Sequence, residues 1–133
     1  MEQFEIQDSR AQLVVVPALG AGIVRYEASR KDGTSVPLLR SWNASAGAVP
    51  FSLACNPLLP WSNRISGGGF SYQGRFHPLE PNLQGQKYPL HGNGFQVPWT
   101  IESSVPSSDS GSVRLAEAGL APLGEKFRAF LAK

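Results

Sequence analysis

Hydrophobic positions along the chain come in short runs that glycine and proline interrupt. Residues 11–16 form a valine-rich run, and residues 22–28 form a second run after a Gly-Ala-Gly turn. Short apolar runs between turn residues are typical of β-strands. We therefore predict two strands that pair as a hairpin. A third strand is predicted over residues 35–39, where Pro37 restricts it to the edge of a sheet.

The middle of the chain contains a clear hairpin pattern. Residues 70–72 and 75–77 flank Gln73-Gly74, and glycine there can take a positive φ. Composition and spacing also predict two later strands and two loops. The strands are expected over residues 99–102 and 112–115, and the loops over residues 43–47 and 103–111.

The C-terminal segment has a different periodicity. Pro122 suits the first turn of a helix, and four apolar residues after it fall on one helical face. These residues are Leu123, Phe127, Phe130 and Leu131. We predict a short amphipathic helix over residues 121–132, which Gly124 weakens.

Length and composition agree with a small β-rich protein. The chain has 133 residues, enough for one small domain, with 14 Gly and 11 Pro that divide it into short elements. Apolar residues make up 41% and charged residues 17%, which argues against general disorder. The predicted fold class is mainly β, an antiparallel sandwich with a short C-terminal helix.

Charge and cysteine usage exclude several classes of protein. The net charge of +2 is small and the cations are scattered, so we expect no nucleic-acid partner. The single cysteine, Cys55, permits no intramolecular disulfide, and we expect it to be a buried small hydrophobe. No signal-peptide pattern or membrane-spanning run is present, so no membrane partner and a cytoplasmic location are predicted.

The residues that could carry chemistry lie between positions 56 and 99. Asn63 offers a hydrogen-bond donor and an acceptor, and the Arg64 guanidinium offers a fork of donors. Sugar hydroxyls need partners of both kinds. The imidazole of His91 can donate, accept or shuttle a proton near neutral pH. Three aromatic residues could pack on a sugar ring or belong to the core. They are Trp61, Phe95 and Trp99.

Several motifs in this segment, taken in order, resemble those of the aldose 1-epimerases. Asn63-Arg64-Ile65 followed by Gly67-Gly68-Gly69-Phe70 is similar to the Asn-Arg-Ile-x-x-Gly-x-Phe motif of that family. Leu90-His91-Gly92 is similar to its Leu/Ile-His-Gly motif, and Pro98-Trp99 to the pair that follows. The resemblance extends over roughly residues 5–102.

The resemblance implies a large antiparallel β-sandwich that interconverts the α and β anomers of hexoses. The ring opens and closes by acid–base catalysis, without a metal or cofactor. It implies that Asn63, Arg64 and His91 bind the sugar, with His91 also catalytic and near the ring oxygen. The family's principal acid, a second histidine downstream of the Pro-Trp pair, and its base, a late glutamate, have no counterpart here.

We therefore expect residues 1–115 to be the N-terminal part of a mutarotase-like sandwich and residues 116–133 to be a non-matching tail, as truncation or a frameshift would leave. Such a chain would be weakly active or inactive alone. The alternative is a non-catalytic carbohydrate-binding remnant. An incomplete sandwich leaves a sheet exposed, which a homodimer could cover.

Simpler interpretations remain for these residues. Asn63 and Arg64 could be a turn residue and a surface cation, and His91 could be a structural histidine bonded to backbone. His77 is expected to be a solvated hairpin residue. The glycines at 67–69 are not expected to bind phosphate, because an aromatic strand and not a helix follows them.

Overall fold

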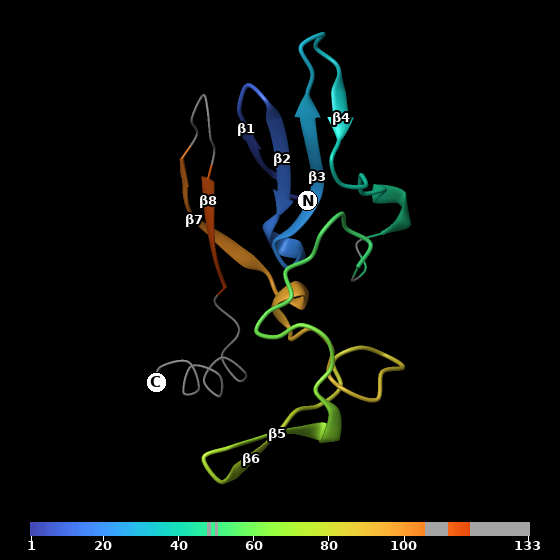
Figure 1. The fold of residues 1–133 in the computed structure, drawn as a ribbon, viewed down its shortest axis with the longest axis vertical. Coiled ribbons are helices and arrows are strands. Elements are labelled where there is room, and N and C mark those ends of the chain that lie inside the picture. Colours follow the sequence, from blue (N-terminus) through green and yellow to red (C-terminus); the bar gives the residue numbers. More distant parts are fainter. Residues whose placement is uncertain (48, 50, 106–111, 118–133) are drawn as a thin grey trace. The chain divides into compact units, whose positions relative to one another are not determined.

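The computed structural model describes residues 1–47, 49, 51–105 and 112–117. These residues form antiparallel β-structure with a few single-turn 3₁₀ helices, so the predicted mainly-β class is confirmed (Figure 1). They fall into two units. One combines residues 1–57 with residues 95–117, and the other contains residues 58–94. The predicted C-terminal helix lies outside the described residues.

A four-stranded antiparallel sheet dominates the first unit, with its strands in sequence order (Figure 1). The strands are β1 (Phe4–Gln7), β2 (Ala11–Val16), β3 (Gly22–Ser29) and β4 (Ser35–Pro37). The predicted pairing of the two valine-containing strands is confirmed. The third predicted strand does lie at an edge of the sheet, where the missing N–H of Pro37 costs no ladder bond.

Strand β1 was not predicted from the sequence. Its burial alternates, since Phe4 and Ile6 are half-buried and Glu5 and Gln7 are exposed. Asp8 closes the turn that follows: its Oδ1 accepts 2.7 Å hydrogen bonds from the backbone N–H groups of Arg10 and Ala11. These two bonds lower the pKa of the Asp8 carboxyl below its ordinary value, and the bond from Arg10 has the larger effect.

The core of this unit lies against one part of the sheet. Val14, Val16 and Val24 pack with Leu53, and Leu19 and Trp42 cover them. β-branched side chains fill a pleated surface well, and burial of each stabilises the fold by roughly 1.5–3 kcal/mol. This explains why the valine-rich runs become the central strands.

The Cys55 prediction was wrong, because this cysteine is exposed. The backbone of Cys55 is the part that contributes to the fold. Cys55 forms an isolated bridge with Ile23, and the Cys55 carbonyl accepts a 2.9 Å hydrogen bond from the Ile23 N–H. Because the bridge uses only backbone groups, residue 55 pairs with strand β3 without requiring the thiol to be buried.

The remaining strands form two hairpins. The first, β5 (Gly69–Tyr72) with β6 (Arg75–Pro78), confirms the predicted hairpin in the second unit. Gln73 and Gly74 have φ of 49° and 74°, the positive values that a type I′ turn requires. The other, β7 (Trp99–Val105) with β8 (Ser112–Glu117), belongs to the first unit.

These last two strands are longer than the sequence indicated, so residues 103–105 extend a strand where a loop was expected. Residues 43–47 do form an irregular connection, which contains one 3₁₀ turn. The four 3₁₀ turns of the described residues are η1 (Pro17–Leu19), η2 (Ala44–Ala46), η3 (Ser66–Gly68) and η4 (Gly94–Gln96). No helix among the described residues is long and apolar enough to cross a membrane.

Candidate functional site

Two segments that are distant in sequence lie side by side in the second unit. An isolated antiparallel bridge pairs Arg64 with Leu90. The Ile65 N–H donates to the Pro89 carbonyl at 3.3 Å, and the His91 N–H donates to the Asn63 carbonyl at 2.9 Å. This short ladder brings together the three residues that the sequence marked as sugar-binding.

Asn63 and His91 are joined by a second hydrogen bond, which involves the imidazole itself. The backbone N–H of Asn63 donates to His91 Nδ1 at 2.7 Å. Both residues have positive φ, 63° and 61°, a region that asparagine and histidine enter more readily than most residues. The unusual backbone at both positions is therefore held by a reciprocal pair of hydrogen bonds.

This geometry selects one form of the imidazole. A ring nitrogen that accepts a hydrogen bond from an N–H carries no hydrogen of its own. His91 is therefore neutral in this arrangement, and its ring hydrogen lies on Nε2. The ring is half-buried, so the Asn63–His91 pair fixes the tautomer of a side chain that still reaches the surface.

Arg64 is exposed, and its guanidinium is held on one side. Gln86 Oε1 accepts from both Arg64 Nη2, at 2.9 Å, and Arg64 Nε, at 3.3 Å. The Asn63 side chain is turned toward its neighbour, since Asn63 Oδ1 accepts from the Arg64 N–H at 2.9 Å. Its Nδ2 donor has no hydrogen-bond partner among the described residues and is available to a ligand.

The sequence did not single out two amides that support these residues. Gln86 contacts Arg64 directly. Asn82 Nδ2 donates to the Leu90 and Gly92 carbonyls, and Asn82 Oδ1 accepts from the Leu90 N–H at 2.8 Å. Both amides lie in the irregular segment between hairpin β5–β6 and His91. Their position between two motifs was the only available signal.

Close packing explains the glycine that follows His91. Gly92 has a φ of 64° and lies so close to the Leu59 carbonyl that a Cβ there would overlap it. Gly94 N–H also donates to the Leu59 carbonyl at 3.0 Å. The residue after His91 must therefore be glycine for the segment to keep this path.

His77 is placed differently from the expectation. Its ring is half-buried and stacks on Phe70, with ring centroids 5.1 Å apart and an interplanar angle of 17°. It is a packing residue of the β5–β6 hairpin, because Phe70 and His77 are directly paired across the two strands. The glycines before Phe70 lead into strand β5 and not into a helix, as predicted.

The aromatic residues proposed for sugar or core are buried to different degrees. Phe95 is buried, with 5% of its surface exposed, and its ring lies 4.9 Å from that of Phe51 in the first unit. Trp61 and Trp99 are half-buried. Phe95 therefore has the burial of a core residue, whereas each of the two tryptophans keeps part of its surface exposed.

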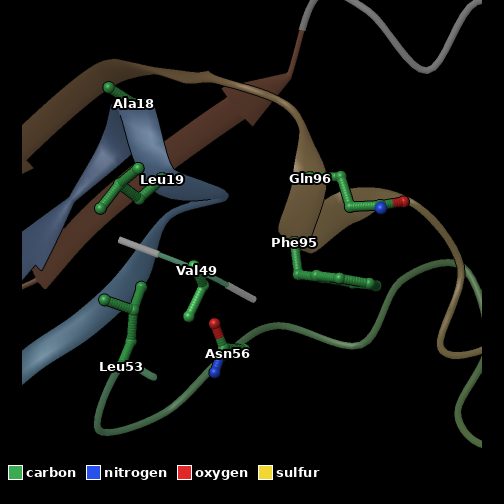
Figure 2. Close-up of a pocket in the computed structure, with 7 residues that line it drawn as sticks. All are labelled: Ala18, Leu19, Val49, Leu53, Asn56, Phe95 and Gln96. Carbon is green, nitrogen blue, oxygen red and sulfur yellow. The ribbon is translucent and has the colours of Figure 1, made fainter. Parts of the chain in front are cut away.

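A cavity of about 260 Å³ lies in the first unit (Figure 2). Figure 2 shows its lining side chains, which are mostly apolar. They are Ala18, Leu19, Val49, Leu53, Asn56, Phe95 and Gln96. None of these side chains titrates, so this cavity offers no acid–base chemistry. The described residues also contain no group of three or more His, Cys, Asp or Glu placed to hold a metal.

Comparison with known proteins identifies the class to which this β-structure belongs. The family model of aldose 1-epimerase matches residues 2–119. A crystal structure of an Escherichia coli K12 protein, provisionally assigned as an aldose 1-epimerase, superposes with a TM-score of 0.66 at 31% identity. The alignment covers 84% of this chain and 35% of the E. coli protein.

The chain therefore belongs to the aldose 1-epimerase family. A second comparison supports this: the chain is 33% identical over 102 residues to the uncharacterized protein YphB of Escherichia coli strain K12. That alignment covers 71% of this chain and 34% of YphB. The chain thus spans about a third of the length of the relatives it matches.

Proposed function

We propose that this chain carries the sugar-binding part of an aldose 1-epimerase site, formed by Asn63, Arg64 and His91, and that its ligand is an aldohexose. The reciprocal hydrogen bonds between Asn63 and His91 are the observation that supports this most strongly. They fix an imidazole donor beside an exposed guanidinium and an exposed amide. Such a set of preorganised donors suits the oxygens of a monosaccharide.

The tautomer of His91 defines its role in this proposal. With Nδ1 accepting from Asn63, the ring hydrogen of His91 lies on Nε2, and we place this side of the ring near the ring oxygen of the sugar. A neutral imidazole cannot give up that hydrogen easily. His91 therefore stabilises the negative charge that develops on the ring oxygen by a hydrogen bond, while the proton itself must come from another acid.

The chain alone is expected to bind sugar without interconverting its anomers rapidly. The only other histidine is His77, which is engaged in stacking on Phe70. The acid and base that the family resemblance implies have no counterpart in the sequence. Anomer interconversion needs both proton transfers, so we propose a binding function for this chain and catalysis only with residues it does not contain.

Saturation-transfer NMR with D-galactose and D-glucose tests the binding. We expect signal transfer to the sugar with the wild-type chain, and loss of most of it with Arg64→Ala and with His91→Ala. The matched control is His77→Ala, which removes a histidine outside the proposed site and should leave the transfer unchanged. Equal transfer in all four proteins would contradict the proposed site.

Polarimetry on fresh α-D-glucose tests the catalytic part of the proposal. The chain should change the rate of mutarotation little above that in buffer. A large acceleration that His91→Ala abolishes would show that the chain contains a complete acid–base system, and the division into binding and proton transfer would be wrong.

A further inference from the structure

The irregular segment from Asn82 to Gln86 contacts both halves of the proposed site. Asn82 is half-buried, and its side chain makes three hydrogen bonds to the backbone around His91. It donates to the Leu90 carbonyl at 2.9 Å and to the Gly92 carbonyl, and it accepts from the Leu90 N–H at 2.8 Å. One amide thus holds the peptide groups on both sides of His91.

Only a side chain with this length and these atoms can make the three bonds. Two of them need an NH₂ donor and one needs an oxygen acceptor, which an amide supplies. An aspartate at position 82 could accept from the Leu90 N–H, but it would place a carboxylate oxygen against two carbonyl oxygens. His91 has a φ of 61°, so the amide stabilises a backbone conformation that the chain would otherwise leave.

Gln86 acts on the other half of the site. Its Oε1 accepts from two nitrogens of the Arg64 guanidinium, which fixes the plane and direction of that group. Gln86 is itself held, because its backbone N–H donates to the Leu83 carbonyl at 3.2 Å and closes a turn. The exposed arginine therefore loses much of its side-chain freedom before any ligand arrives.

We propose that Asn82 and Gln86 are the positioning element of the sugar site, with Asn82 fixing His91 and Gln86 fixing Arg64. This inference rests on the proposed function for the identity of the site. Neither amide needs to touch the sugar. Preorganisation reduces the entropy lost on binding by about 0.5–1.5 kcal/mol per immobilised side chain, which is roughly a twofold to tenfold change in affinity.

Two measurements without sugar test the positioning directly. In the wild-type chain, the imidazole ¹⁵N shifts of His91 should show the Nε2–H tautomer, and Arg64 Nε–H should exchange slowly with water. Asn82→Asp should convert the His91 pattern to a mixture of tautomers. Gln86→Ala should speed the exchange of Arg64 Nε–H several-fold and leave the His91 pattern unchanged.

Gln84→Ala is the matched control, since Gln84 is exposed, lies in the same segment and makes no hydrogen bond among the described residues. It should alter neither measurement. Thermal unfolding of each variant checks that it folds. If Asn82→Asp does not fold, Gln86→Ala and the milder Asn82→Ser carry the test. Unchanged His91 tautomer and Arg64 exchange in the folded variants would overturn the proposal.

Galactose affinity separates this inference from the proposed function. We expect the dissociation constant to rise roughly twofold to tenfold in Gln86→Ala and not to change in Gln84→Ala. If the two sugar-free measurements respond as expected while the wild-type chain binds no sugar, the positioning element stands and the proposed function fails. If the wild type binds sugar and Gln86→Ala binds equally well, positioning by Gln86 is contradicted.

Discussion

At the scale of single residues, the path of the chain around His91 depends on backbone conformations that few side chains permit. Asn63 and His91 have positive φ and hold each other by two hydrogen bonds. Gly92 extends the same conformation where there is no room for a side chain. The site geometry is therefore more sensitive to local substitutions than its exposure to solvent suggests.

Gly92→Ala should destabilise the second unit strongly. Positive φ costs a residue with a Cβ roughly 1–2 kcal/mol, and overlap with the Leu59 carbonyl adds about 1–3 kcal/mol. Gly85→Ala is a matched control, because Gly85 also has positive φ but has open space around it, so only the first cost applies. Urea unfolding measures both, and equal destabilisation would refute the steric explanation.

Asp8 and Asp32 should titrate below their ordinary value of 3.8. Backbone hydrogen bonds to the N–H groups of Arg10 and Ala11 lower the pKa of Asp8, and the Thr34 hydroxyl, followed by the Thr34 N–H, lowers that of Asp32. Folding lowers both pKa values, so the two ionised carboxylates stabilise the folded chain at pH values above their ordinary pKa. This stabilisation is lost as the pH falls through the lowered pKa values of the folded chain. Carboxyl ¹³C titration checks this, and midpoints at or above 3.8 would contradict it.

At the scale of elements, the turn between β5 and β6 offers a test of local conformation. Gln73 has a φ of 49° ahead of Gly74, in a turn that asparagine-glycine favours. Gln73→Asn should stabilise the hairpin by about 0.5 kcal/mol, whereas Gln73→Val should destabilise it by roughly 1–2 kcal/mol. Thermal unfolding monitored at Phe70 and Phe76 measures both changes, and the opposite order of stability would contradict a type I′ turn.

The strands and turns also show which parts of the fold can be predicted from the sequence. Apolar runs bounded by turn residues correctly predicted strands β2 and β3, and Gln73-Gly74 predicted the β5–β6 turn, because these signals are local. Strand β1 has only two apolar positions and depends on pairing with β2. Asn82 and Gln86 could not be predicted, since their hydrogen bonds join positions 8 to 22 residues apart.

At the scale of the whole molecule, the chain spans about a third of the length of its relatives. A homodimer that covers a face of the sheet remains a prediction. Sedimentation velocity over a range of concentrations tests it. We expect the sedimentation coefficient to rise with concentration toward that of a dimer, and a constant monomer value would contradict the prediction.

The central claim is that Asn63, Arg64 and His91 together bind a hexose. The most direct measurement is a ¹H–¹⁵N NMR titration of the chain with D-galactose, extended to the side-chain resonances of these three residues. The account predicts saturable shifts centred on Asn63, Arg64 and His91, with smaller shifts at Gln86. Absence of shifts at high millimolar galactose, or saturable shifts confined to the first unit, would contradict it.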